Sequence, residues 1–177
     1  MNNVLKIGLG ILLAGGFAWL AFGFFGIQAL FVNRAVEEEI PESVSSLISP
    51  SQADADAQGE LLGKGSFQQG DSTYSIVGNV FMGRADGQIS LTFTEFEVTN
   101  GPDLFVYAVK TNTTDNKTVK DAVANGDFLN LGALKGNLGN QIYSIENEFD
   151  SEEYQVISIW CRRFSRNFGS AKLEQSS

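Results

Sequence analysis

The chain has 177 residues, 43% of them hydrophobic, which suffices for one packed domain plus an appendage but not for two large domains. Its formal net charge of -9, from 12 basic and 21 acidic residues, argues against a nucleic acid partner, because phosphate binding needs clustered Lys and Arg. With no His and a single Cys, the chain lacks the commonest general base, the commonest metal ligand and any intrachain disulfide. No metal-ligating or cofactor-binding residue is predicted from the sequence.

An uncharged run extends from Ile7 to Val32. It exceeds the roughly 20 residues that a helix needs to cross a bilayer and the roughly 7–15 residue core of a cleavable signal peptide. We therefore expect residues 1–34 to be a retained transmembrane anchor, with the lipid bilayer as the partner of residues 7–32. Cleavage remains open as an alternative, because Ala21-Phe22-Gly23 offers small residues at the required spacing.

The charges that flank this run predict its orientation. Lys6 and the amino terminus lie on one side, whereas Arg34 on the other side is followed by glutamates at 37–39. Positive residues are retained in the cytoplasm. We expect a single-pass membrane protein with a cytoplasmic amino terminus and an extracytoplasmic domain.

Residues 35–60 contain seven acidic residues and no Lys or Arg, which predicts an acidic, flexible and solvated linker. Its first half has apolar residues at helical spacing, so a short amphipathic helix is expected there, interrupted or started by Pro41. These apolar residues are Val36, Ile40, Val44, Leu47 and Ile48.

The remaining residues, 61–177, show short strand patterns. Ile89, Leu91 and Phe93 alternate with polar residues, as in a half-buried strand, and the alternation then slips, which predicts a bulge near Glu95. Residues 104–109 are apolar on both faces and predict a central strand.

Turn signals separate these strands. Residues 83–87 are a hairpin candidate, residues 100–103 (Asn-Gly-Pro-Asp) form a turn, and the polar residues 111–120 are expected to form a loop. Short strands without a long helical period predict an all-β fold for residues 61–177, an antiparallel β-sandwich or barrel-like domain.

The segment 156–161 (Val-Ile-Ser-Ile-Trp-Cys) is the clearest strand of all. Strand alternation places Ile157, Ile159 and Cys161 on one apolar face, so Cys161 is expected to point into the core. Two interpretations follow. A buried structural thiol is the common case, whereas a reactive thiol is supported by the positive charge of Arg162, Arg163 and Arg166, which stabilises a thiolate.

Three motifs together suggest a family: a Gly-Pro-Asp-Leu turn, a Lys-Gly to Gln-x-Tyr segment and an Ile-Trp-Cys strand. With them, residues 61–173 resemble the DM-thirteen domain, found in Skeletor-type proteins beside DOMON domains and in many bacterial membrane-anchored proteins. The matching residues are Gly65-Ser66-Phe67, Gly78, Phe96, Gly101-Pro102-Asp103-Leu104, Val106-Tyr107, Leu134-Lys135-Gly136, Gly139-Asn140-Gln141, Tyr143, Val156, Ile159-Trp160-Cys161, Phe164, Phe168-Gly169, Ala171 and Leu173.

The resemblance implies an all-β, sandwich-like domain with a redox or electron-transfer role centred on the cysteine matched by Cys161. Many members of the family carry a His in the segment that matches Gln68–Ser75, and this chain has none there. We expect a membrane-tethered, extracytoplasmic redox domain with a redox or interaction partner outside the cytoplasm. The alternative is a non-catalytic binding or protein-interaction sandwich with a structural Cys161, and the residues do not decide whether the chain is an enzyme.

Overall fold

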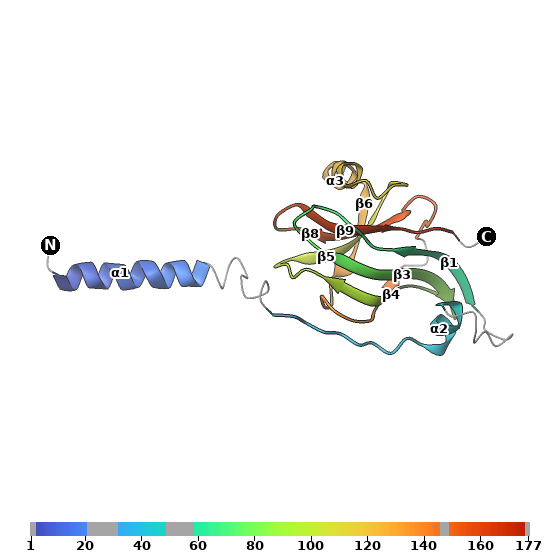
Figure 1. The fold of residues 1–177 in the computed structure, drawn as a ribbon, viewed down its shortest axis with the longest axis horizontal. Helices are drawn as coiled ribbons and strands as arrows, with labels where there is room; N and C mark the ends of the chain where they lie inside the picture. Colours follow the sequence, from blue (N-terminus) through green and yellow to red (C-terminus); the bar gives the residue numbers. More distant parts are fainter. Residues whose placement is uncertain (1–2, 21–31, 49–58, 146–148, 176–177) are drawn as a thin grey trace. The chain divides into compact units, whose positions relative to one another are not determined.

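The computed structural model describes residues 3–20, 32–48, 59–145 and 149–175 (Figure 1). The chain divides into two compact units, and nearly all of the described strands and helices belong to the second, which comprises residues 33–99 and 103–177. The first unit contains helix α1 (Asn3–Ala18).

Helix α1 has 16 residues and exposes its large apolar side chains, such as Leu12 and Phe17. Most of the rest of the expected membrane span, residues 21–31, lies outside the described residues. In the ranges that the structure describes, no helix is both long and apolar enough to cross a membrane. The transmembrane helix expected over residues 7–32 is therefore not shown.

The second unit is a sandwich of two antiparallel sheets, as the strand patterns predict (Figure 1). One sheet has the order β1-β3-β4-β7 and the other has the order β2-β9-β8-β5-β6. The strand bounds are β1 (Gly59–Ser66), β2 (Gln68–Gln69), β3 (Ile76–Ala85), β4 (Gln88–Val98), β5 (Leu104–Val109), β6 (Phe128–Ala133), β7 (Gln141–Ile145), β8 (Val156–Cys161) and β9 (Arg166–Lys172).

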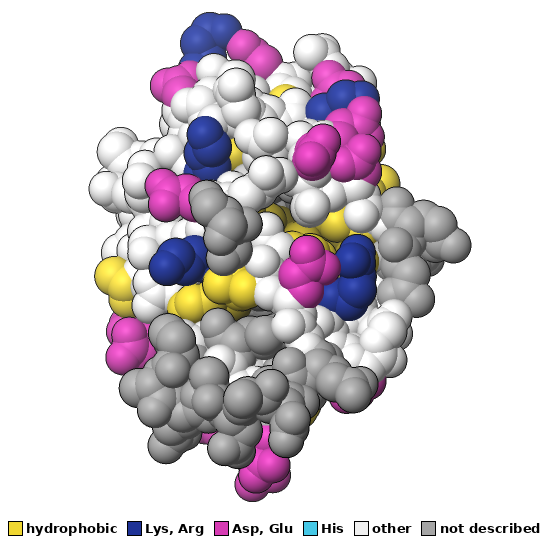
Figure 2. Space-filling model, turned by 90° about the vertical axis from the view of Figure 1, so that its right-hand side faces the viewer, with side chains coloured by type: hydrophobic (Ala, Val, Ile, Leu, Met, Phe, Trp, Pro, Cys, Tyr) yellow, Lys and Arg dark blue, Asp and Glu magenta, His cyan; other side chains and the backbone are white. Residues whose placement is uncertain are grey.

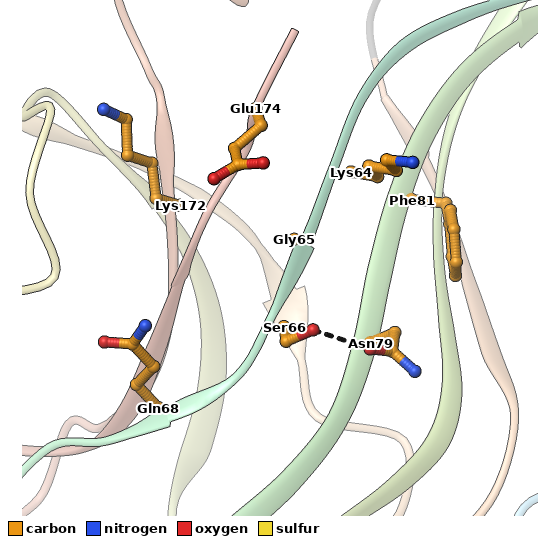
Figure 3. Close-up of a pocket in the computed structure, with 8 residues that line it drawn as sticks. All are labelled: Lys64, Gly65, Ser66, Gln68, Asn79, Phe81, Lys172 and Glu174. Atoms are coloured by element: carbon orange, nitrogen blue, oxygen red, sulfur yellow. Dashed lines mark hydrogen bonds between the residues drawn. The ribbon is translucent and has the colours of Figure 1, made fainter. Parts of the chain in front are cut away.

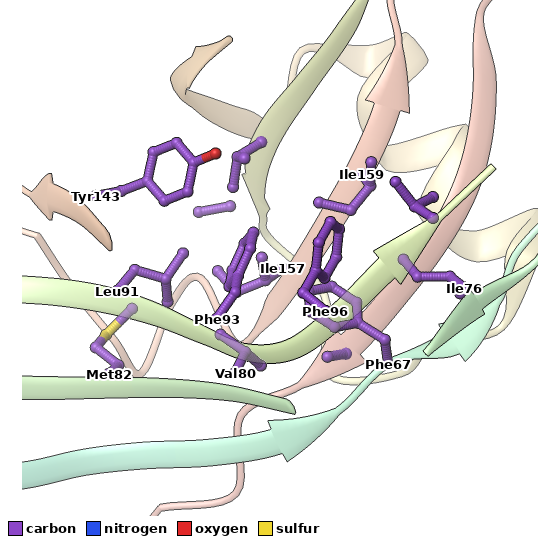
Figure 4. Packing of buried hydrophobic residues seen from close by; sticks show 14 of the residues in the cluster. Phe67, Ile76, Val80, Met82, Leu91, Phe93, Phe96, Tyr143, Ile157 and Ile159 are labelled. Atoms are coloured by element: carbon purple, nitrogen blue, oxygen red, sulfur yellow. The ribbon is translucent and has the colours of Figure 1, made fainter. Parts of the chain in front are cut away.

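The main core lies between the two sheets and is rich in aromatic rings (Figure 4). Phe67, where the chain passes from β1 to β2, meets Phe93 edge-on with ring centroids 5.2 Å apart. Phe93 also packs against Phe96, at 5.0 Å, and these β4 rings face Ile157 and Ile159 of β8 (Figure 4). Burial of such side chains is the dominant stabilising term of the fold.

The predicted bulge and hairpin are both confirmed. Glu95 has a positive φ of 51°, and the register of β3 and β4 shifts so that Glu95 and Phe96 together oppose Gly78. The β3–β4 turn consists of Asp86 and Gly87, both with positive φ (52° and 75°), as a two-residue hairpin that follows the twist of its strands requires.

Strand β5 is central in its sheet, as predicted, because it pairs with β6 on one side and β8 on the other. Its outer face lies under a second apolar cluster, which includes Tyr107, Val109 and Trp160. Residues 166–172, beyond the last strand that the sequence indicated, form β9 and pair with β8. The strand that carries Cys161 is therefore an interior strand.

The loop prediction for residues 111–120 is wrong, because helix α3 (Asn116–Asn125) begins there. The side chain of Asp115 accepts a hydrogen bond from the backbone of Thr118, which caps the helix. Only Val119 and Ala122 are buried, so a short helix with a narrow apolar face gives little periodicity to detect.

Residues 35–48, predicted to be part of a solvated linker, lie within the second compact unit. Helix α2 (Glu42–Ile48) starts directly after Pro41, in agreement with the helix expected in this region, and the Val44 side chain is 7% exposed. Residues 49–58, where the sequence is most typical of a flexible chain, lie outside the described residues.

Candidate functional site

Cys161 is the last residue of β8, where it pairs with Leu104 of β5 and Arg166 of β9. Its exposed fraction is 0%, and it belongs to the core between the sheets together with Ile157 and Ile159. The predicted inward orientation is confirmed.

The turn that follows β8 contacts the sulfur. Burial raises the pKa of the Cys161 thiol above its usual value, whereas hydrogen bonds from the backbone N–H groups of Phe164 and Arg163 act in the opposite direction. The negative charge of Asp103 adds to the increase. Because the net shift is upward, the thiol is protonated at neutral pH in this conformation.

Two of the arginines that follow Cys161, Arg162 and Arg166, form ion pairs with carboxylates. Arg162 Nε lies 3.2 Å from Asp103 Oδ2, and its guanidinium lies over the Phe105 ring, 4.2 Å from the centroid. Arg166 lies 3.9 Å from a carboxylate oxygen of Asp71. The negative charges of Asp103 and Asp71 therefore offset part of the positive charge that was expected to stabilise a Cys161 thiolate.

Trp160 points to the opposite face of β8 from Cys161. Its ring lies nearly parallel to that of Tyr107, with centroids 6.3 Å apart, and Tyr107 in turn stacks on Phe128 at 4.3 Å. Burial raises the pKa of Tyr107. Tyr143, by contrast, lies on β7 in the other sheet, where burial raises its pKa to about 12. Tyr107 is therefore adjacent to Trp160, whereas Tyr143 lies in the other sheet.

A buried polar network links β8, β9 and α3, and nothing in the sequence pattern indicated it. Asn167 Oδ1 accepts hydrogen bonds from Ser158 Oγ (3.0 Å) and Ser170 Oγ (3.2 Å), and all three residues are fully buried. Asn167 Nδ2 donates to Asn116 Oδ1, and Asn116 Nδ2 donates to Asp71 Oδ1. This network fixes α3 on the sheet that carries Cys161.

A polar pocket of about 290 Å³ lies where β1 and β9 come together (Figure 3). Lys172 of its lining pairs with Val156, at the far end of β8, so the pocket lies about 16 Å from Cys161 along the strand. The pocket and the thiol are therefore separate sites. The lining residues are Lys64, Gly65, Ser66, Gln68, Asn79, Phe81, Lys172 and Glu174.

The charged surface shows no single-sign patch in the view of Figure 2, where Lys and Arg side chains alternate with Asp and Glu side chains. Within the described ranges, no three His, Cys, Asp or Glu side chains are placed to hold a metal ion.

Comparisons with known proteins agree with the family suggested by the motifs. The profile of the family described as "Electron transfer DM13" matches residues 66–173, which is more than half of the chain and includes Cys161 and the turn after it. No curated protein matches the chain, and no solved structure matches it. The two-sheet domain built around β8 therefore belongs to the DM13 electron-transfer family.

Proposed function

We propose that this chain is a membrane-tethered, extracytoplasmic electron-transfer domain and that Cys161 is its redox residue. The observation that supports this role most directly is that the backbone N–H groups of Phe164, Arg163 and Asp103 lower the pKa of the Cys161 thiol, against the larger rise that burial causes. Amide donors stabilise a thiolate more than a thiol. The site thus provides stabilisation for the reactive form of Cys161, although burial keeps the thiol protonated.

The chemistry requires the turn at residues 162–165 to open, because the sulfur is fully buried. Ser165 in this turn has a positive φ of 50°, an unfavourable conformation for a residue other than glycine. This backbone strain raises the free energy of the closed turn and so lowers the free energy needed to open it. When the turn opens, water and a partner can reach the sulfur. The sulfur is then no longer buried, so its pKa falls.

A single cysteine can exchange with a disulfide of another protein. The Cys161 thiol first loses its proton to water. The resulting thiolate attacks one sulfur of the partner's disulfide, and the partner's other sulfur leaves as a thiolate. The product is a mixed disulfide, in which Cys161 is oxidised and the leaving sulfur is reduced. A disulfide-bearing partner fits the oxidising compartment outside the cytoplasm.

Membrane tethering is part of the proposal and is supported by the uncharged run at residues 7–32 and by the charges beside it. Alkaline extraction of membranes, followed by protease treatment of intact cells or spheroplasts, tests this location. We expect the chain to stay with the membrane and the sandwich to be cleaved from outside. Release by alkali, or protection of the sandwich, would contradict it.

Alkylation of the native protein by iodoacetamide tests the redox role. Cys161 is expected to react through turn opening, at a rate well above that of global unfolding, which hydrogen exchange of the β8 amides reports. Reaction only as fast as global unfolding would reject Cys161 as the redox residue.

A second candidate function is a non-catalytic binding sandwich in which Cys161 is structural. The full burial of the sulfur and its raised pKa favour this alternative. It predicts that Cys161→Ala lowers the free energy of unfolding but leaves partner binding unchanged. In the redox proposal the same variant no longer forms a mixed disulfide with its partner.

A further inference from the structure

An extended segment before the sandwich is paired with it. Residues 33–40, which we call the strap, run along residues 135–142, which we call the strap groove and which comprise most of the β6–β7 connection and the start of β7 (Figure 1). Ala35 and Leu138 form a parallel β-bridge. The backbone hydrogen bonds are Val36 N to Leu138 O (2.9 Å), Glu38 N to Asn140 O (3.1 Å), Asn137 N to Arg34 O (3.0 Å) and Leu138 N to Arg34 O (3.4 Å).

Two glycines let the strap approach the groove this closely. A Cβ atom built on Gly136 would overlap the carbonyl oxygen of Arg34, and one built on Gly139 would overlap that of Val36. Gly139 also has a positive φ of 93°. No other residue type fits at these two positions while the strap is in place, so the groove is shaped for a backbone.

A charged contact fixes the register of the strap. The Glu38 carboxylate accepts hydrogen bonds from Lys135 Nζ at 2.8 and 2.9 Å and from the backbone N–H of Ile142 at 2.7 Å. Lys135 Nζ also donates to the Ile142 carbonyl oxygen. Such charge-assisted hydrogen bonds are stronger than neutral ones and select a carboxylate. Burial opposes ionisation of Glu38, but these donors keep its pKa below the usual value.

Alternate strap side chains face the sandwich. Val36, Glu38 and Ile40 are half-buried, whereas Ala35, Glu37 and Glu39 are exposed, with the Glu37 carboxylate accepting one hydrogen bond from Asn140 Nδ2 at 3.2 Å. Proteins that bind an extended peptide recognise it in the same way. Main-chain hydrogen bonds supply affinity, and every second side chain of the peptide supplies specificity. The groove lies within the region that matches the family, residues 66–173, and the strap lies outside it.

We propose that the strap groove is a peptide-binding site for an extended acidic segment of the form apolar-x-Glu-x-apolar, and that the chain's own strap occupies it reversibly. Docking makes the residues just after the N-terminal run part of the domain. Release lengthens the connection between that run and β1. This inference goes beyond the redox proposal and does not depend on Cys161.

Hydrogen exchange of the full-length protein in detergent tests the docking. We expect Glu38→Lys to reduce the protection of the Val36 and Glu38 amides by at least tenfold, with the β8 amides unchanged. Glu39→Lys is the matched control, because it makes the same charge change at an exposed neighbouring position. An equal effect of both variants, or strap amides that exchange only with the β8 amides, would overturn reversible docking.

Glycine substitutions give a second, independent variant. Gly139→Ala should release the strap, whereas Gly132→Ala should not, because Gly132 also has a positive φ (126°) but no atom lies within 4 Å of an added Cβ. The pair separates loss of docking from backbone strain alone. Equal protection of the Val36 amide in the two variants would contradict the close approach at Gly139.

Binding in trans tests the site itself. A labelled peptide of residues 33–41 is titrated against the full-length Glu38→Lys protein, whose groove is vacated, and fluorescence anisotropy is recorded. Saturable binding, weakened at least tenfold when the peptide carries Glu38→Lys but not when it carries Glu39→Lys, supports the proposal. No binding, or equal binding of the two substituted peptides, would show that the strap is only a fixed part of the fold.

Discussion

Replacing Ser165 with glycine tests whether Cys161 is reached through its turn. Ser165 has a φ of 50°, and a residue with a side chain pays about 1 kcal/mol more than glycine in that conformation. Ser165→Gly should therefore stabilise the closed turn by about 1 kcal/mol. If the turn opens locally before the sulfur reacts, the alkylation rate should fall about fivefold.

Asp86→Gly is the matched control for this experiment. Asp86 has a nearly identical φ of 52° and lies in the β3–β4 turn, so glycine there stabilises the fold without touching the β8–β9 turn. The assay is iodoacetamide labelling followed by mass spectrometry, with urea denaturation to measure the global gain of each variant. Equal slowing by the two variants, at equal global gain, would refute local opening and place the reaction in the unfolded state.

Three further predictions concern the sandwich itself. Gly78→Ala should lower the free energy of unfolding, measured by urea denaturation, by about 3 kcal/mol, because the added Cβ would meet the backbone of the bulge. Gly87→Ala is the control and should lower it by only about 1 kcal/mol, because an added Cβ there lies in open space. Equal losses of stability in the two variants would contradict the bulge geometry. Asp115→Ala should remove the cap of α3 and cost about 1 kcal/mol, seen as faster exchange of the α3 amides; unchanged exchange would argue against the cap. Although burial opposes ionisation, the hydrogen bond from Asn116 and the ion pair with Lys120 hold the pKa of Asp71 below its usual value. This carboxylate should therefore stabilise the protein above about pH 4 and lose that effect as the pH falls. Asp71→Asn should flatten the fall in stability as the pH drops below about 4, and parallel curves for the two proteins would contradict this assignment.

The strand pattern was informative where burial alone determines the alternation. The inward position of Cys161, the bulge at Glu95 and the central place of β5 all follow from which residues are apolar, because one face or both faces of each strand are buried. The motifs that resemble the DM-thirteen domain cover the same elements.

Other features depend on contacts that local periodicity does not encode. The strap docks through backbone hydrogen bonds and the carboxylates of Glu37 and Glu38, onto residues about a hundred positions away in sequence. Its acidic composition therefore indicated only solvation. Helix α3 is marked by its caps at Asp115 and Gly126 and not by its apolar face. The network around Asn167 joins side chains from three separate elements, and such pairings appear only once the sheets are assembled.

The proposed electron-transfer role depends on whether Cys161 exchanges with a disulfide in the folded protein. The most direct measurement incubates the native chain with oxidised glutathione and follows the mixed disulfide at Cys161 by mass spectrometry, with Cys161→Ser as the control. We expect a mixed disulfide that forms faster than the β8 amides exchange by global unfolding. A thiol that stays reduced until the sandwich unfolds would contradict it and would leave Cys161 a structural residue of the core.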